Sequence, residues 1–242
     1  GLQTPKPYLK IDGKTILEHT VNKFINFSNL KDLLIVIHKE HQALYDTAFT
    51  FLNPPPAVIG SNQRKDSVYN GLKEFLNVKN DDIVLIHDAA RPLVAKEDIE
   101  AILEIMKSAD AATLATPVTD TLQRDGDTIS RDNLWAIQTP QAFRFGKLME
   151  AHEKFKEDDK FTDDAGLMRA MGYKVEIVPA SSQNIKITTA DDFAMVEAMI
   201  KSPTETRTAM GFDVHAFEKE RSDRKLMLGG LKIDHDVALT GH

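Results

Sequence analysis

The chain has 242 residues, enough for one large domain or two small ones, and its 42% hydrophobic and 28% charged residues exclude a disordered, collagenous or low-complexity chain. It lacks cysteine, a secretory signal and an apolar run near the roughly 18 residues of a membrane span, so we expect a cytoplasmic protein without disulfides, thiolate chemistry or a membrane partner. The net charge of −7, from 30 basic and 37 acidic residues, argues against a nucleic-acid surface but leaves room for a phosphate site made by a few converging cations.

The first half of the chain alternates short apolar runs rich in β-branched residues with amphipathic segments of helical period. Helices are expected at 15–25, 41–51, 64–76 and 96–107, and the third should bury Val68, Leu72, Phe75 and Leu76 on one face. Strands are expected at 32–38, 57–60, 83–87 and 111–116, the first buried on both faces. This alternation predicts βαβ units, and therefore a Rossmann-like α/β fold with a doubly wound, mostly parallel sheet between two helical layers.

The pattern changes at Pro117. Residues 117–139 carry short strand-like pieces around the turn signal Arg124-Asp-Gly-Asp127, which predicts a projecting antiparallel β-arm. Helices resume at 145–155 and 163–171, strands follow at 173–178 and 184–188, and a helix is expected over 190–200. We divide the chain into a domain over 1–201, a polar linker over 202–209 and the start of a second α/β domain over 210–242.

The segment after the strand at 83–87 is the first candidate for chemistry. Ligands of open α/β sheets bind beyond the carboxyl ends of the strands, where Asp88 is followed by Ala89, Ala90 and Arg91. The Asp88 carboxylate suits a divalent cation on phosphates or a ribose hydroxyl. Taken alone, the segment is explained slightly better by a loop salt bridge between Asp88 and Arg91.

The second candidate is the segment from Gly60 to Ser67, which leads into a helix whose N-terminus favours anions. Taken alone, it is better explained by Ser61 or Asn62 capping that helix.

Three cations and one threonine complete the candidate residues. Lys6, Arg131 and Lys186 are each, taken singly, best explained as solvated surface charges. Thr162, before two aspartates, is most simply a helix N-cap.

Seven segments, taken together, resemble one enzyme family in its own order over residues 1–200. They are Pro-Lys-Pro-Tyr-Leu at 5–9, Gly-Ser-Asn-Gln-Arg-Lys-Asp-Ser-Val at 60–68, His-Asp-Ala-Ala-Arg-Pro at 87–92, Arg-Asp-Asn-Leu-Trp at 131–135, Thr-Pro-Gln at 139–141, Thr-Asp at 162–163 and Asn-Ile-Lys-Ile-Thr at 184–188. The family is 2-C-methyl-D-erythritol 4-phosphate cytidylyltransferase, a nucleotidyltransferase of non-mevalonate isoprenoid synthesis that transfers CMP from CTP to methylerythritol phosphate and releases pyrophosphate.

The resemblance implies a role for each matching residue. Lys6 and Lys186 would flank the α-phosphate and stabilise the pentacoordinate transition state, and Mg²⁺ would bridge the phosphates near Asp88. The residues implied on the CTP side are Ser61, Asn62, Arg64, Ser67, Asp88 and Ala89. Those implied to bind methylerythritol phosphate are Arg91, Thr121, Arg131 and Thr162. The family's arm reaches into a second subunit, so the resemblance implies a homodimer in which Thr121 and Arg131 serve the partner's site.

Three departures from the family are visible. Pro7 stands where glutamine is usual, and Asn62 where an acidic residue is common. The chain also starts just past the position of the family's first strand and glycine-rich phosphate loop, and we expect that this segment is omitted from the sequence.

The tail resembles the start of a second family, 2-C-methyl-D-erythritol 2,4-cyclodiphosphate synthase, in residues 211–217, 228–231 and 239–242. The resemblance implies that Asp213 and His215 are ligands of Zn²⁺ or another divalent cation, with a third ligand beyond the chain end, and that His242 lies near substrate phosphates. Since the two enzymes occur fused in some bacteria, it implies a bifunctional protein, with a higher oligomer possible through a complete second domain. The tail by itself has an incomplete zinc site, so we expect no cyclase activity from it.

Two other functions stay open. One is a cytidylyltransferase for another polyol phosphate such as ribitol 5-phosphate, and the other is a non-catalytic dimerising remnant.

Overall fold

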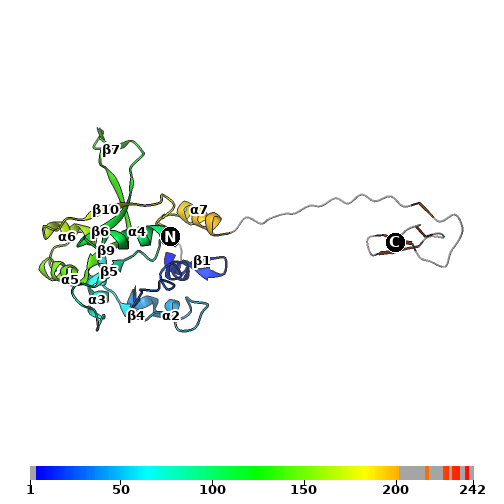
Figure 1. Cartoon of the computed structure of the whole chain (residues 1–242), viewed down its shortest axis with the longest axis horizontal. Coiled ribbons are helices and arrows are strands. Elements are labelled where there is room, and N and C mark those ends of the chain that lie inside the picture. The colour runs from blue at the N-terminus through cyan, green and yellow to red at the C-terminus, as the bar shows by residue number, and fades with distance from the viewer. Residues whose placement is uncertain (1–3, 202–215, 218–225, 229–230, 235–237, 240–242) are drawn as a thin grey trace. The chain divides into compact units, whose positions relative to one another are not determined.

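The computed structural model (Figure 1) describes residues 4–201, 216–217, 226–228, 231–234 and 238–239. The chain divides into two compact units, Gly1–Ser202 and Pro203–His242. Among the described residues, no helix has both the length and the apolar character of a membrane span.

A four-stranded sheet forms the centre of the first unit, in the order β10 (Glu176–Pro179), β6 (Ala111–Pro117), β9 (Trp135–Arg144) and β5 (Ile83–Ile86). Strand β10 is parallel to β6, whereas β9 is antiparallel to both β6 and β5. Three of the four strands therefore run in one direction, and the predicted mostly parallel α/β fold is confirmed.

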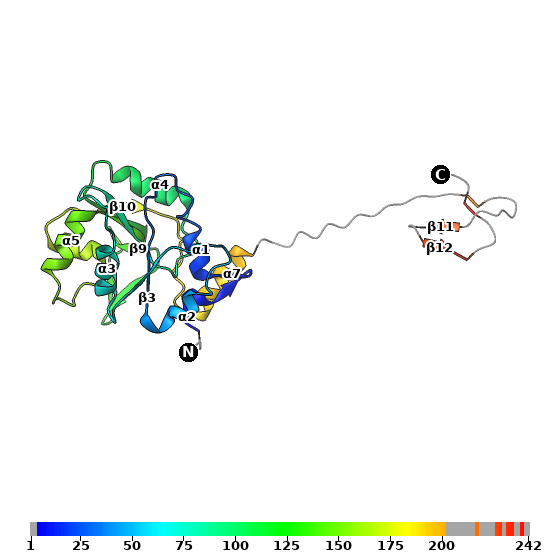
Figure 2. The same cartoon turned by 90° about the horizontal axis from the view of Figure 1, so that it is seen from below.

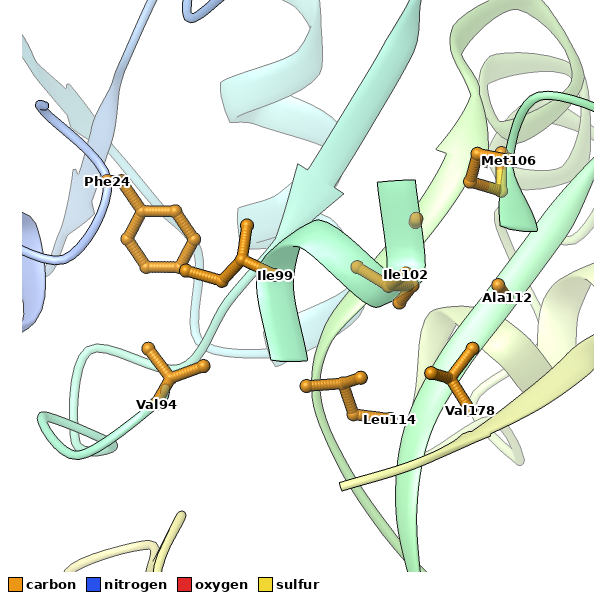
Figure 3. Close-up of a cluster of buried hydrophobic side chains, with 9 residues drawn as sticks. Phe24, Val94, Ile99, Ile102, Met106, Ala112, Leu114 and Val178 are labelled. Carbon is orange, nitrogen blue, oxygen red and sulfur yellow. The ribbon is translucent and has the colours of Figure 1, made fainter. Parts of the chain in front are cut away.

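Helices cover both faces of this sheet (Figures 1 and 2). On one face, α4 (Lys96–Ile105) packs against β6 and β10 through a cluster shown in Figure 3, which includes Ile99, Ile102, Met106, Ala112, Leu114 and Val178. On the other face lie α3 (Arg64–Lys73), α5 (Phe145–Lys154) and α6 (Asp164–Ala170), joined by a cluster that includes Leu72, Ala111, Phe143, Leu148 and Met168. Neighbouring strand residues fall into opposite clusters because successive side chains of a strand point to opposite faces.

The central strand β9 is one that the sequence pattern does not predict. Pro140 lies in its middle and donates no hydrogen bond, which argues against a central strand. The register with β6 shifts between Thr113 and Ala115, so that three residues of β9, 138–140, face the single Leu114. This bulge accommodates the proline and lets the ladder resume on both sides.

The other elements of the first unit, apart from the arm described below, lie outside the four-stranded sheet. They are η1 (Lys6–Tyr8), β1 (Lys10–Ile11), β2 (Lys14–Thr15), α1 (Ile16–Val21), the parallel pair β3 (Ile35–Ile37) and β4 (Ala57–Ile59), η2 (Lys39–His41), α2 (Gln42–Tyr45) and α7 (Ala190–Ile200). The helix over 190–200 agrees with its prediction, but the helices expected at 15–25 and 41–51 are shorter.

Three other expectations are wrong. The strand expected at 184–188 does not form, because Ile187 donates its main-chain bond to Ala90 in a loop rather than to a neighbouring strand. The strand expected at 32–38 is not buried on both faces, since Val36 is 37% exposed. Leu76 lies beyond the end of α3 and is 88% exposed, so it does not join the buried face of that helix.

The expected arm is present as the hairpin of β7 (Leu122–Arg124) and β8 (Asp127–Ile129), which projects from the body of the first unit (Figure 1). Asp125 and Gly126 at its tip have φ of 53° and 95°. Asp-Gly tolerates these positive angles in a two-residue turn, as the sequence predicts.

In the second unit, β11 (Leu226–Leu228) pairs antiparallel with β12 (Leu231–Ile233), and Phe217 bridges to Leu239. The proposed linker over 202–209 lies outside the described residues, as do Asp213, His215 and His242.

Candidate active site

The Asp88 carboxylate lies just beyond the end of β5 and has three cationic partners. Its Oδ2 is 3.0 Å from the Nζ of Lys186 and 3.5 Å from the Nε of Arg91, and its Oδ1 is 3.8 Å from the Nε of Arg64. The three cations come from the segment before α7, the loop after β5 and the start of α3. The expected Asp88–Arg91 salt bridge therefore exists as part of a larger group, which we call the Asp88 cluster: Arg64, Asp88, Arg91 and Lys186.

Charge in the Asp88 cluster is unbalanced. Burial raises the pKa of Asp88, but Lys186, Arg64 and Arg91 together lower it by more, so the carboxyl group has a pKa below its usual value and is ionised at neutral pH. With Asp164, the second partner of Arg64, included, three cations still face two carboxylates. Such an excess of positive charge at the edge of a sheet favours an anionic ligand even in a protein of net negative charge.

The Arg64 guanidinium is held by a second carboxylate. Its Nη1 donates to the Oδ2 of Asp164 at 2.7 Å, and the Oδ1 of Asp164 is 3.0 Å from the Nε2 of His152. Asp164 and His152 are both almost completely buried. Burial lowers the pKa of Arg64, yet Asp164, Asp88 and Asp163 raise it above its usual value. Sequence spacing does not reveal this pair, because Arg64 and Asp164 are 100 residues apart.

Thr162 is not the N-cap of α6, contrary to expectation. The N-cap is Asp163, whose Oδ1 accepts from the main-chain N–H of Gly166 at 2.9 Å, while Thr162 is exposed. The Oδ2 of Asp163 accepts from the Nε2 of Gln141, and the Oε1 of Gln141 accepts from the main-chain N–H of Ala165. Buried Gln141 thus fixes the start of α6, and with it Asp164, to β9.

A chain of hydrogen bonds holds residues 87–91, which follow β5 and which we call the Asp88 loop. The main-chain N–H of Asp88 donates to the Oγ1 of Thr139 at 3.0 Å, and that oxygen lies 3.1 Å from the Nδ1 of His87. The Nε2 of His87 is 3.1 Å from the carbonyl oxygen of Arg91, which can only accept. His87 is therefore the Nε2–H tautomer and accepts from Thr139. Burial lowers the pKa of His87 to about 4, against smaller contributions that raise it, so the ring is neutral at pH 7.

Neither Ser61 nor Asn62 caps α3, contrary to expectation, because the N-cap residue is Gln63, without a side-chain cap bond. Instead, the Oγ of Ser67 accepts from the N–H of Ser61 at 2.9 Å and lies 2.8 Å from the carbonyl oxygen of Gln63. A Cβ atom on Gly60 would lie 2.7 Å from that same Oγ, so a larger residue there would displace the Ser67 side chain. Ser61 and Ser67 are thereby held next to Arg64 at the start of the helix.

Other predicted residues are not joined to the Asp88 cluster by a hydrogen bond or ion pair among the described residues. Lys6 lies in η1, where Tyr8 packs in the same hydrophobic cluster as Ala89. Arg131 donates through Nη1 to the carbonyl oxygen of Thr119 within the arm, and Thr121 is exposed on the arm.

Within the described part of the chain, no three His, Asp or Glu side chains are arranged to hold a metal ion. Asp88 alone therefore suits only a metal that phosphate oxygens would help to bind. A divalent cation could meet this requirement, because such an ion can be held by one or two carboxylates together with substrate phosphates.

The chain is similar to known proteins of one family. Residues 1–202 match the family described as 2-C-methyl-D-erythritol 4-phosphate cytidylyltransferase (IspD). The "Bifunctional enzyme IspD/IspF" of Gluconobacter oxydans is 42% identical over 248 residues, which cover all of this chain and 61% of the relative. The protein of the same name from Paramagnetospirillum magneticum is 36% identical, and the match covers all of this chain and 63% of the relative. The chain thus spans somewhat under two thirds of these curated relatives.

Solved structures give the same result. The Francisella tularensis 2-C-methyl-D-erythritol 4-phosphate cytidylyltransferase matches 80% of this chain and 93% of its own, at 34% identity and a TM-score of 0.70. The bifunctional IspDF of Campylobacter jejuni matches all of this chain and 61% of its own, at 25% identity and a TM-score of 0.71. The fold, the residues around Asp88 and these similarities together show that the chain belongs to the 2-C-methyl-D-erythritol 4-phosphate cytidylyltransferase family.

Proposed function

We propose that this protein transfers CMP from CTP to 2-C-methyl-D-erythritol 4-phosphate. A phosphate oxygen of the acceptor attacks the α-phosphorus of CTP, a new P–O bond forms, and the bond to the bridging oxygen breaks to release pyrophosphate. The observation that carries the proposal is the Asp88 cluster, with three cations around one carboxylate beyond β5. Both reactants are anions, so neutralising and orienting them accounts for most of the catalysis such a site can provide.

The proposed roles follow the family pattern. Lys186 and Lys6 flank the α-phosphate and stabilise the charge of the transition state. Asp88 would hold Mg²⁺ on the triphosphate, where the ion supplies further charge neutralisation. The residues assigned to CTP are Ser61, Asn62, Arg64, Ser67, Asp88 and Ala89. Those assigned to the acceptor are Arg91 and Thr162, with Thr121 and Arg131 contributed from the arm of a second subunit.

Assembly, location and the second activity are part of the proposal. The protein is a homodimer joined through the β7–β8 arm and works in the cytoplasm. Its domains are 1–201 and a cyclodiphosphate synthase domain that begins at 210, joined by the linker 202–209. The relatives named bifunctional IspD/IspF support the fusion. In that second domain, Asp213 and His215 bind Zn²⁺ or another divalent cation and His242 contacts substrate phosphates.

The test is pyrophosphate release from CTP by the purified protein with two acceptors, methylerythritol phosphate and ribitol 5-phosphate. The proposal expects a clearly higher kcat/KM for methylerythritol phosphate. Equal or better turnover of ribitol 5-phosphate would refute the assigned acceptor. No turnover with either acceptor would refute the catalytic function and support a dimerising remnant.

A further inference from the structure

Asn184 lies at the centre of the contacts that hold the Lys186 segment. Its side chain is fully buried, and its Nδ2 donates to the Oε1 of Gln138 and to the carbonyl oxygen of Thr139, both at 2.9 Å. Since the main-chain carbonyl can only accept, the NH₂ group of Asn184 must face β9. Its own main-chain carbonyl oxygen accepts from the Nη1 of Arg91 at 2.7 Å. Asn184 therefore joins the bulge of β9 to the Asp88 cluster.

The segment that carries Lys186 has no strand to fix it. Residues 184–188 form no ladder, and one main-chain bond, from the N–H of Ile187 to Ala90 at 2.9 Å, joins them to the Asp88 loop. The Ile187 side chain is buried in a cluster with Ile11, Ile16 and Val196. Between the anchors at 184 and 187 stands Lys186, whose Nζ reaches Asp88 at 3.0 Å. Because these contacts replace a β-ladder, the position of the lysine depends on each of them.

One buried atom of the Asn184 side chain lacks a partner in the described part of the chain. Its Oδ1 is buried and has no hydrogen-bond partner among the described residues. Leaving a buried acceptor unpaired costs free energy, but an aliphatic side chain would instead leave the Oε1 of Gln138 and the carbonyl oxygen of Thr139 without the Nδ2 donor. The two Nδ2 bonds are what an aliphatic residue could not supply.

We infer that Asn184 is a positioning residue, which holds Lys186 at the reacting phosphate through its two bonds to the bulge of β9. The inference rests on the proposed cytidylyl transfer, because the effect on catalysis is exerted through Lys186. Asn184 itself is buried beneath the Asp88 cluster and acts through the main chain.

A double-mutant cycle tests the catalytic part. Asn184→Ala should lower kcat by about tenfold or more, since a displacement of about 1 Å in a reacting group costs up to about a hundredfold. In a Lys186→Ala background the same change should lower kcat by less than about twofold, because coupled residues are not additive. The same fold loss in both backgrounds would overturn the inference. Ile102→Val, a buried change in the α4 core, is the stability control and should leave kcat unchanged.

Amide hydrogen exchange tests the positioning without turnover, and so separates this inference from the proposed function. In Asn184→Ala the amide of Ile187 should exchange at least about tenfold faster, while that of Leu114 in β6 changes by less than about twofold, because only the local opening becomes easier. Equal acceleration at both amides would show a global stability effect and refute the inference. If Asn184→Ala does not fold, Asn184→Asp, which keeps the size but places an oxygen against the Thr139 carbonyl, gives the same comparison.

Discussion

Stability at mildly acid pH should depend on the ring of His87, which is partly buried. In the folded protein its pKa is about 4, with burial as the largest cause, against an ordinary value of 6.5. Between pH 6.5 and pH 4, the unfolded chain therefore binds a proton at His87 that the folded protein does not bind. The free energy of unfolding falls as pH falls through this window. A difference of one in pKa between the two states corresponds to about 1.4 kcal/mol. The wild-type protein should therefore lose roughly 2 kcal/mol between pH 7 and pH 5 through His87, and roughly 3 kcal/mol by pH 4.

Urea unfolding followed by the fluorescence of Trp135, the one tryptophan, measures this loss. The control is His87→Gln, which has no group that titrates in this range and can still donate to the carbonyl oxygen of Arg91. Subtracting the two curves removes the contributions of all other titrating groups. The wild-type curve should fall more steeply than the control from about pH 6.5 downwards. Two parallel curves would refute the reasoning, because they would mean that His87 has the same pKa in the folded and unfolded states.

Three further changes test other parts of the structure. Lys186→Ala should lower kcat by at least about tenfold because it removes a cation from the transition state; a change confined to KM would show that the lysine only binds substrate. Asp164→Ala should destabilise the fold by about 1–3 kcal/mol in urea unfolding, since buried His152 and partly exposed Arg64 both lose a partner, and an unchanged free energy of unfolding would contradict this role of the carboxylate. Ile102→Ala should cost about 2–5 kcal/mol through the cavity it leaves in the α4 core while KM for CTP stays unchanged, and a raised KM would show that this core is coupled to the site.

Much of the architecture can be inferred from local patterns. The alternation of apolar runs and helical periods predicts a mostly parallel sheet and its two helical layers, because burial on one face imposes a period on each element. The Asp-Gly turn predicts the arm, and the helix over 190–200 begins where Thr189 and Asp192 form a capping box. Asp88 could be chosen as a candidate site residue because the sequence places it directly after an expected apolar strand.

The tertiary structure alone decides the contacts between distant segments. Strand β9 escapes prediction since Pro140 contradicts strand propensity and only the bulge opposite Leu114 makes room for it. The segment at 184–188 has strand-like alternation but no strand beside it to complete a ladder. The Arg64–Asp164 pair joins residues 100 positions apart.

Sequence by itself therefore determined the class of fold, the arm and which side chains are candidates for binding phosphates or a divalent cation. It determined these because each depends on properties of a short stretch of chain. Which side chains meet, and what holds Lys186 in place, depend on how separate stretches pack against one another. Two bonds from Asn184, one from Arg91 to the Asn184 carbonyl oxygen and one from Ile187 help to hold this segment in the absence of a strand, and only the folded chain brings their partners within reach.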